Sequence, residues 1–201
     1  MKVTIVDYGA GNVPSVERAL QRLGAESLRT NSPACISEAD ALLLPGVGHI
    51  AALVRALDEQ GLRAPLVNGI HRGVPFLGIC LGLQVLFGSS EEAPELNGLH
   101  LLPGRVSALP SSVKLPHMGW NQVAEKRESR LLRGLPKDAY FYFAHSYAAR
   151  DSNGGAVATC AHGAEFAAVI EQQNIFAVQF HPEKSGAPGA RVLQNFLGLA
   201  A

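Results

Sequence analysis

Short runs rich in Val, Ile and Leu alternate along this chain with stretches of amphipathic spacing, and this alternation constrains the fold more than any other feature. It is typical of parallel strands that are buried on both faces and connected by helices. We therefore expect an α/β fold with an open mixed, mostly parallel sheet and helices on both faces. In the first half the expected strands are Val3–Asp7, Ser27–Arg29, Ala41–Leu44 and Phe76–Ile79, and the expected helices are Pro14–Leu23, Ile50–Leu57 and Leu81–Phe87.

Beyond about Gly88 the alternation fades and turn-forming residues become frequent, which indicates a smaller irregular or antiparallel region. The pattern then predicts three further strands and a closing helix, at Tyr140–Phe143, Ala167–Glu171, Ile175–Phe180 and Gly189–Leu197. A length of 201 residues suits one α/β unit, and no linker or repeat divides it. We expect a single domain over residues 1–201.

Charge and hydropathy exclude several classes of partner. Seventeen basic residues balance seventeen acidic ones, so the chain lacks the positive field of a nucleic-acid-binding protein. No apolar stretch reaches the roughly 20 residues that a membrane span needs, so we expect no membrane partner. The first run, MKVTIVD, meets Asp7 before it could form the core of a secretion signal, and we expect a cytoplasmic protein.

The chain carries no recognisable pattern for a metal or a cofactor. Its three cysteines, Cys35, Cys80 and Cys160, form no C-x-x-C pair, and its histidines form no H-E-x-x-H motif. Gly9-Ala10-Gly11 follows the first strand as in a dinucleotide-binding loop, but Pro14 occupies the third glycine position. We expect neither a metal nor a cofactor, and we set aside a nucleotide-binding module.

Gly78-Ile79-Cys80-Leu81-Gly82 has the form G-x-C-x-G at a strand-to-helix junction, like the nucleophile elbow of hydrolases. The glycines remove side chains that would clash in so sharp a turn. The thiol is then held at the carboxyl end of a strand, where the N-terminus of the next helix favours a thiolate. The alternative is that Cys80 is a buried small apolar residue.

A nucleophilic cysteine needs a base and a group that orients the base. His181 follows an apolar strand, and Pro182 ends the pairing there. Glu183 lies two residues further on, and in extended backbone such residues share a face. We predict a triad of Cys80, His181 and Glu183, against the alternative of a structural histidine beside a solvated carboxylate.

The third strand ends in Pro45-Gly46-Val47-Gly48, where glycines let backbone N–H groups turn toward the neighbouring strand end. Together with the N–H of Leu81, this loop could bind the oxyanion that forms when a carbonyl is attacked. The alternative is an ordinary turn between a strand and a helix.

These segments resemble the class I (triad-type) glutamine amidotransferases, through PGVG, GICLGLQ and HPEKS in that chain order. Within that family the chain is similar to the glutaminase subunits of imidazole glycerol phosphate synthase, which act in histidine biosynthesis. This narrower resemblance rests on DYGAGN (7–12), SSEEAP (89–94), PHMGWN (116–121), YFYFAHSY (140–147) and QFHPEKSG (179–186).

The resemblance implies a flavodoxin-like amidotransferase fold and an enzyme that hydrolyses glutamine to glutamate and ammonia. It implies that Cys80 attacks the substrate, that His181 transfers protons and that Glu183 orients His181. By the same resemblance Gln84 and backbone groups at Gly46, Gly48, Ser146 and Tyr147 hold the glutamine.

A partner is also implied, a (β/α)8-barrel cyclase that consumes the ammonia and makes imidazole glycerol phosphate and aminoimidazole carboxamide ribonucleotide. The residues that the resemblance places toward the barrel are Asn12, Met118, Trp120, Tyr140 and Lys184. Taken alone, Trp120 is more typical of a core and Lys184 of a solvated charge.

Three alternatives remain at this stage. The chain could be an amidotransferase that serves another synthase, a cysteine hydrolase without an ammonia acceptor, or a non-catalytic interaction protein of flavodoxin-like fold.

Overall fold

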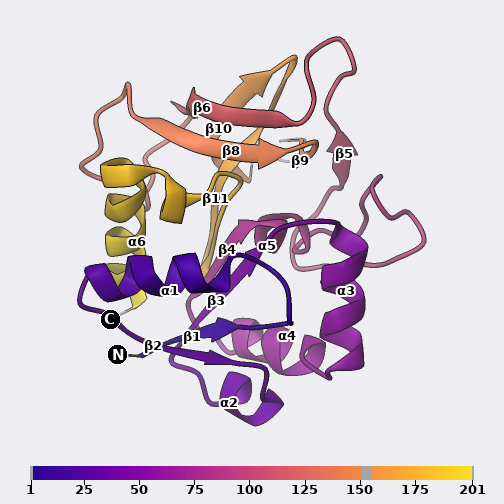
Figure 1. Cartoon of the computed structure of the whole chain (residues 1–201), viewed down its shortest axis with the longest axis vertical. Coiled ribbons are helices and arrows are strands. Elements are labelled where there is room, and N and C mark those ends of the chain that lie inside the picture. The colour runs from indigo at the N-terminus through magenta and orange to yellow at the C-terminus, as the bar shows by residue number, and fades with distance from the viewer. Residues whose placement is uncertain (1, 151–154, 201) are drawn as a thin grey trace.

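The apolar runs form one large sheet in the computed structural model, which describes residues 2–150 and 155–200. Within these ranges five neighbouring strands are parallel, and three more extend the sheet by antiparallel pairing (Figure 1). The order across the sheet is β2 (Glu26–Thr30), β1 (Lys2–Val6), β3 (Ala41–Gly46), β4 (Phe76–Cys80), β12 (Ile175–Val178), β11 (Ala164–Gln172), β10 (Ala156–His162) and β7 (Ala124–Glu125). The predicted open and mostly parallel sheet is confirmed.

Helices cover both faces of the parallel strands. They are α1 (Val13–Arg22), α2 (Pro33–Ser37), α3 (Ile50–Glu59), α4 (Arg63–His71), the single turn α5 (Leu81–Gln84) and α6 (Gly186–Ala200). Since successive residues of a strand point to opposite faces, Ala41 and Leu43 of β3 enter one core with α1 and α6. Leu42 and Leu44 enter a second core with α2, α3 and α4. None of the helices in the described ranges is long and apolar enough to cross a membrane.

Two helices were not predicted. α2 spans only five residues, and α4 contains Pro65 and Gly69, which obscure a helical pattern in the sequence. Both helices form because they bury apolar side chains against the sheet, among them Ile36 of α2 and Leu66 of α4. By contrast, the predicted end of α1 is confirmed, since Gly24 has a φ of +72° and its N–H donates to the carbonyl of Gln21.

The segment between β4 and β10 forms two small antiparallel sheets, as the turn-rich sequence indicated. One pairs β5 (Val106–Ala108) with β9 (Tyr147–Ala149), and the other pairs β6 (His117–Gln122) with β8 (Tyr140–His145) (Figure 1). The second sheet is tied to the chain that follows β12, because the N–H of His181 donates to the carbonyl of Tyr142 at 2.8 Å. This bond brings the β6–β8 sheet over the carboxyl end of the parallel strands.

Candidate functional site

Cys80 occupies a strained elbow between β4 and α5. Its φ of 55° and ψ of −105° lie where non-glycine residues are rare and cost about 1–3 kcal/mol. The two flanking glycines are required by contact, since a Cβ at Gly78 would overlap the carbonyl of Gly82, and one at Gly82 would overlap the carbonyl of Leu44. The turn therefore holds the thiol at the end of β4, as the motif predicted.

The helix after the elbow is shorter than predicted. We expected Leu81–Phe87, but α5 ends at Gln84. After Gln84 the chain tightens, since the N–H groups of Leu86 and Phe87 donate to the carbonyls of Leu83 and Gln84, three residues back. The carbonyls of Val85 and Leu86 accept hydrogen bonds from the 99–102 segment. Because one turn aligns few peptide dipoles, the helix dipole contributes less at Cys80 than the sequence suggested, and side-chain contacts matter more.

His181 lies against both other members of the predicted triad. Its side chain interacts with that of Cys80, and its Nδ1 lies 2.9 Å from Glu183 Oε1. The side chains of His181 and Glu183 are only 2% and 1% exposed. The three groups therefore form a continuous buried chain from sulfur to carboxylate.

The backbone that produces this contact differs from the prediction. β12 ends at Val178 rather than Phe180, and Glu183 lies in the 3₁₀ turn η1 (Pro182–Lys184) rather than in extended backbone. The turn folds the Glu183 carboxylate back onto the imidazole. The Ser185 hydroxyl stabilises this turn by donating to the carbonyl of His181 at 2.7 Å. The prediction of contact was right, but the reason given for it was wrong.

The triad carries opposite charges on adjacent side chains. Burial by itself lowers the pKa of His181, but hydrogen bonds and charge interactions with Cys80 and Glu183 outweigh burial and raise that pKa above its ordinary value. Burial raises the pKa of Glu183, yet the bond and charge of His181 and a bond from Asn12 together lower it. The site thus stabilises an imidazolium next to a carboxylate.

A pocket opens over the thiol. Of the predicted substrate-binding residues, six line it, namely Val47, Gly48, Leu81, Gln84, Ser146 and Tyr147. Gly46 does not line the pocket but pairs with Cys80 in the β3–β4 register, where a Cβ would lie 2.5 Å from that of Leu81. The pocket also includes Glu92, Ala144 and His145, which we did not predict.

Gln84 is held in one orientation inside this pocket. Its Nε2 donates to the carbonyl of Tyr147 at 2.7 Å and to Gln179 Oε1 at 3.1 Å. Gln179 Nε2 in turn lies 3.5 Å from Cys80 Sγ. Among the described residues Gln84 Oε1 is buried and has no hydrogen-bond partner.

Two residues of the site that were not predicted lie inside sequence motifs quoted above. Gln179 stands two residues before His181 in QFHPEKSG, and Glu92 lies in SSEEAP. Glu92 Oε2 accepts a hydrogen bond from the N–H of Ile50 at the start of α3, which fixes its carboxylate at the pocket wall. The contacts that give both residues a role join distant segments, so no local spacing predicts them.

The residues expected at a partner interface fall into two groups. Met118, Trp120 and Tyr140, on β6 and β8, are exposed by 64%, 55% and 51%, and we call them the exposed apolar patch. Trp120 is therefore not a core residue. Lys184 Nζ lies over the ring of Tyr142, which itself contacts Trp120 edge to face. Asn12, by contrast, donates to Glu183 Oε1 at 3.1 Å and so belongs structurally to the triad.

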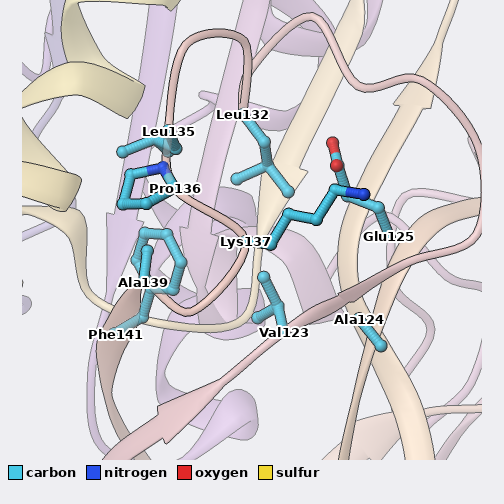
Figure 2. A pocket seen from close by; sticks show the side chains of 9 residues that line it. All are labelled: Val123, Ala124, Glu125, Leu132, Leu135, Pro136, Lys137, Ala139 and Phe141. Carbon is cyan, nitrogen blue, oxygen red and sulfur yellow. The ribbon is translucent and has the colours of Figure 1, made fainter.

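A second cavity, of about 250 Å³, lies away from the thiol. Figure 2 shows its mainly apolar lining, with the charged ends of Glu125 and Lys137 on one side. None of the triad residues lines it, and its lining contains no Cys, Ser or Thr. Across the described ranges no three His, Cys, Asp or Glu side chains are grouped so that they could hold a metal ion.

Comparison with known proteins gives a consistent result. The family model described as glutamine amidotransferase class-I matches residues 4–199. A crystal structure of a glutamine amidotransferase has a TM-score of 0.79 at 21% identity over 98% of both chains. PurLQS from Thermotoga maritima has a TM-score of 0.77 at 20% identity over 100% of this chain and 99% of its own. These two likenesses show the shared fold, and the family match shows that the chain belongs to the class I glutamine amidotransferases, a family of enzymes.

Closer relatives narrow the type within that family. The imidazole glycerol phosphate synthase subunit HisH of Methanothermobacter thermautotrophicus is 50% identical over 195 residues, which are 97% of each chain. The HisH subunit of Aquifex aeolicus is 44% identical over 198 residues, covering 98% of this chain and 96% of its own. The chain is therefore an amidotransferase of the HisH type.

Proposed function

We propose that this chain, acting as one domain over residues 1–201, hydrolyses glutamine to glutamate and ammonia through Cys80, His181 and Glu183. It does so as the glutaminase subunit of imidazole glycerol phosphate synthase in histidine biosynthesis. The observation that carries this proposal is His181, buried between the Glu183 carboxylate and Cys80, the residue of the three that lines the pocket. The free thiols of Cys35, Cys80 and Cys160 support a cytoplasmic location.

The chemistry follows from the charges of the triad. His181 takes the proton of the Cys80 thiol, and the sulfur attacks the side-chain amide carbon of glutamine to form a tetrahedral intermediate. As the C–N bond breaks, the His181 imidazolium gives its proton to the leaving nitrogen, which departs as ammonia. Water then attacks the thioester while neutral His181 takes its proton. The C–S bond breaks to release glutamate, and the His181 imidazolium returns the proton to the sulfur.

Glu183 acts through His181 rather than on the substrate. Its carboxylate accepts a hydrogen bond from the Nδ1–H of His181. Nε2 is then the nitrogen that exchanges protons with the sulfur and the substrate. The N–H of Leu81, directly after the nucleophile, and the 46–48 loop are suited to hold the developing oxyanion.

The other end of the pocket suits the amino-acid part of glutamine. The Glu92 carboxylate can contact an ammonium group and supplies the opposite charge, and Gln84 lines the same pocket. These contacts distinguish an amino acid from a simple amide, and they favour an amidotransferase over a general cysteine hydrolase.

Covalent labelling tests the reaction and the nucleophile together. We expect a diazoketone analogue of glutamine to modify Cys80 alone, and glutamine in excess to prevent the labelling, because both compete for one pocket. The modified peptide is identified by mass spectrometry. Cys35 and Cys160 are internal controls, and burial raises the pKa of Cys160 to about 12, so that it stays a protonated thiol. Labelling elsewhere, or labelling that glutamine does not slow, would contradict the proposal.

We further propose a heterodimer in which the exposed apolar patch faces a (β/α)8-barrel cyclase. Three large apolar side chains gathered on one small sheet are typical of an interaction surface. Free ammonia becomes ammonium in water at neutral pH, so the cyclase must receive it through a path closed to solvent. Lys184, which follows Glu183 directly and lies over Tyr142 beside Trp120, connects this surface to the triad.

Trp120→Ala tests this surface. We expect it to weaken binding to the cyclase about 30-fold, as for an aromatic hot spot of about 2 kcal/mol, without altering stability, since the side chain is exposed. Calorimetric titration of the two purified chains measures the change. Arg55→Ala, an exposed substitution on α3, is the matched control. If the two variants bound the cyclase with equal affinity, the exposed apolar patch would not be part of the interface.

A further inference from the structure

Two buried histidines lie beside the triad without taking part in it. His117 of β6 and His145 of β8 are opposite each other in the register of the small sheet, and they are 5% and 6% exposed. His117 Nδ1 lies 3.1 Å from His145 Nε2. The mechanism proposed above uses neither ring, yet His145 lines the pocket over Cys80.

The neighbours of this pair determine which nitrogen carries each proton. A carbonyl can only accept, so His145 Nδ1, at 2.9 Å from the carbonyl of Tyr147, must be the donor. In a neutral ring His145 Nε2 then accepts, and His117 Nδ1 is the donor to it. His117 Nε2 accepts in turn from Asn121 Nδ2 at 3.2 Å.

The amide of Asn121 is itself fixed at both ends. Its Nδ2 donates to the carbonyl of Ala161 at 3.2 Å, and its Oδ1 accepts from the N–H of Gln122 at 2.8 Å. The bonds therefore run in one direction, from Asn121 through His117 and His145 to Tyr147. We call these four residues the histidine relay.

The relay ends at the wall of the pocket. The Tyr147 carbonyl accepts from His145 and also from Gln84 Nε2, whose second bond reaches Gln179 and through it Cys80 Sγ. A shift of this carbonyl would move Gln84, which lines the pocket. The position of the carbonyl thus sets the position of a ligand-binding group.

We propose that His145, backed by His117, is a positioning residue for glutamine binding: its Nδ1–H fixes the Tyr147 carbonyl and thereby Gln84. This inference rests on the proposed glutaminase function and deepens it. The effect is on the affinity for glutamine rather than on bond cleavage, because the relay contacts the binding wall and not the scissile amide.

The surroundings keep both rings neutral, as the relay requires. His117 stacks on Phe143 and on His162, with ring centroids 4.8 and 4.2 Å apart, and His145 packs against Phe166. Burial lowers the pKa of His117 to about 4 and that of His145 to about 3. His162 and His181 are the titratable groups that face the pair. A positive charge on His162 opposes protonation of both rings, and one on His181 opposes protonation of His145, so these neighbours also lower the pKa values.

Two substitutions of His145 distinguish the role of its Nδ1–H donor from the packing role of its ring. An asparagine side chain would place an amide N–H near the position of the imidazole Nδ1, so His145→Asn can keep the bond to Tyr147. His145→Gln instead reaches toward His117 and loses that bond. We expect His145→Gln to raise the KM for glutamine about tenfold, which is the change in affinity expected from the loss of one hydrogen bond. We expect kcat to change less than about threefold. We expect His145→Asn to stay within about threefold of the wild type in both constants.

His162→Ala is the matched control, since it removes a ring stacked on His117 but no bond of the relay. We expect its KM to be that of the wild type. Equal KM values for His145→Gln and His145→Asn would overturn the positioning role and leave the two histidines as packing residues.

Nitrogen-15 NMR of labelled histidine gives a readout that is independent of turnover. We expect both rings as the Nδ1–H tautomer, with no titration between pH 8 and pH 5. An Nε2–H tautomer, or a midpoint near the ordinary value of about 6.5, would overturn the relay even if the enzyme hydrolyses glutamine. If the wild type showed the expected tautomers but no Cys80-dependent hydrolysis, the proposed function would fail, and the positioning role with it.

Discussion

Cys80→Ala is expected to lower glutamine hydrolysis by about 10⁴-fold or more, because it removes the atom that forms the covalent bond, and the remaining triad has nothing to activate. Synthesis from added ammonium salts by the complex with the cyclase should persist at the wild-type rate, since that reaction needs only the partner's site. Glutamate release and cyclase product are measured on the same preparation, with glutamine or with ammonia as the nitrogen source.

Cys160→Ala is the control for this experiment. Cys160 is also a buried free thiol, 4% exposed on β10, but it lies outside the pocket, and its substitution should leave both activities intact. Loss of the ammonia-dependent reaction in Cys80→Ala would instead indicate damage to the fold or to the complex. Glutamine hydrolysis retained by Cys80→Ala would refute the mechanism.

The second large effect is expected from Gly82→Ala. A Cβ at this position would overlap the backbone carbonyl of Leu44, which sits in the centre of the sheet and cannot move independently. We expect the free energy of unfolding to fall by about 3 kcal/mol or more, or the variant to remain unfolded. Urea denaturation followed by circular dichroism measures the loss.

Gly198→Ala is the matched substitution for Gly82→Ala. Gly198 lies within α6 with open space where a Cβ would stand, so alanine should be neutral or should stabilise the protein by up to about 1 kcal/mol. If Gly82→Ala were as stable as Gly198→Ala, the close approach of α5 to β3 would not be the reason for a glycine in the elbow.

Much of the fold could be predicted because its signals are local. The strands β1, β3 and β4 are continuous apolar runs, and the helices α1 and α3 have regular apolar spacing. α2 and α4 carry weaker signals, and packing against the sheet stabilises them. α5 stops early because the chain after Gln84 tightens to hydrogen bonds between residues three apart, and the 99–102 segment bonds to the carbonyls of Val85 and Leu86.

In the candidate site too, features that depend on neighbouring residues were predicted, and features that depend on distant residues were not. The elbow around Cys80 was predictable because the glycines that permit it are neighbours in sequence. The contact between His181 and Glu183 was predicted as well, although the 3₁₀ turn that makes it was not. Gln179, Glu92 and His145 were missed, since their roles depend on partners 42 to 99 residues away or on the shape of the pocket.

The sequence by itself determined the class of fold, the candidate nucleophile and the family, because alternating apolar runs, a glycine-flanked cysteine and short motifs are properties of adjacent residues. Only the tertiary structure decided that Trp120 is exposed, that Asn12 bonds to Glu183 and that two histidines hold fixed tautomers beside the pocket. Exposure and hydrogen-bond direction depend on which distant groups surround a side chain, and only the packed sheet brings those groups together.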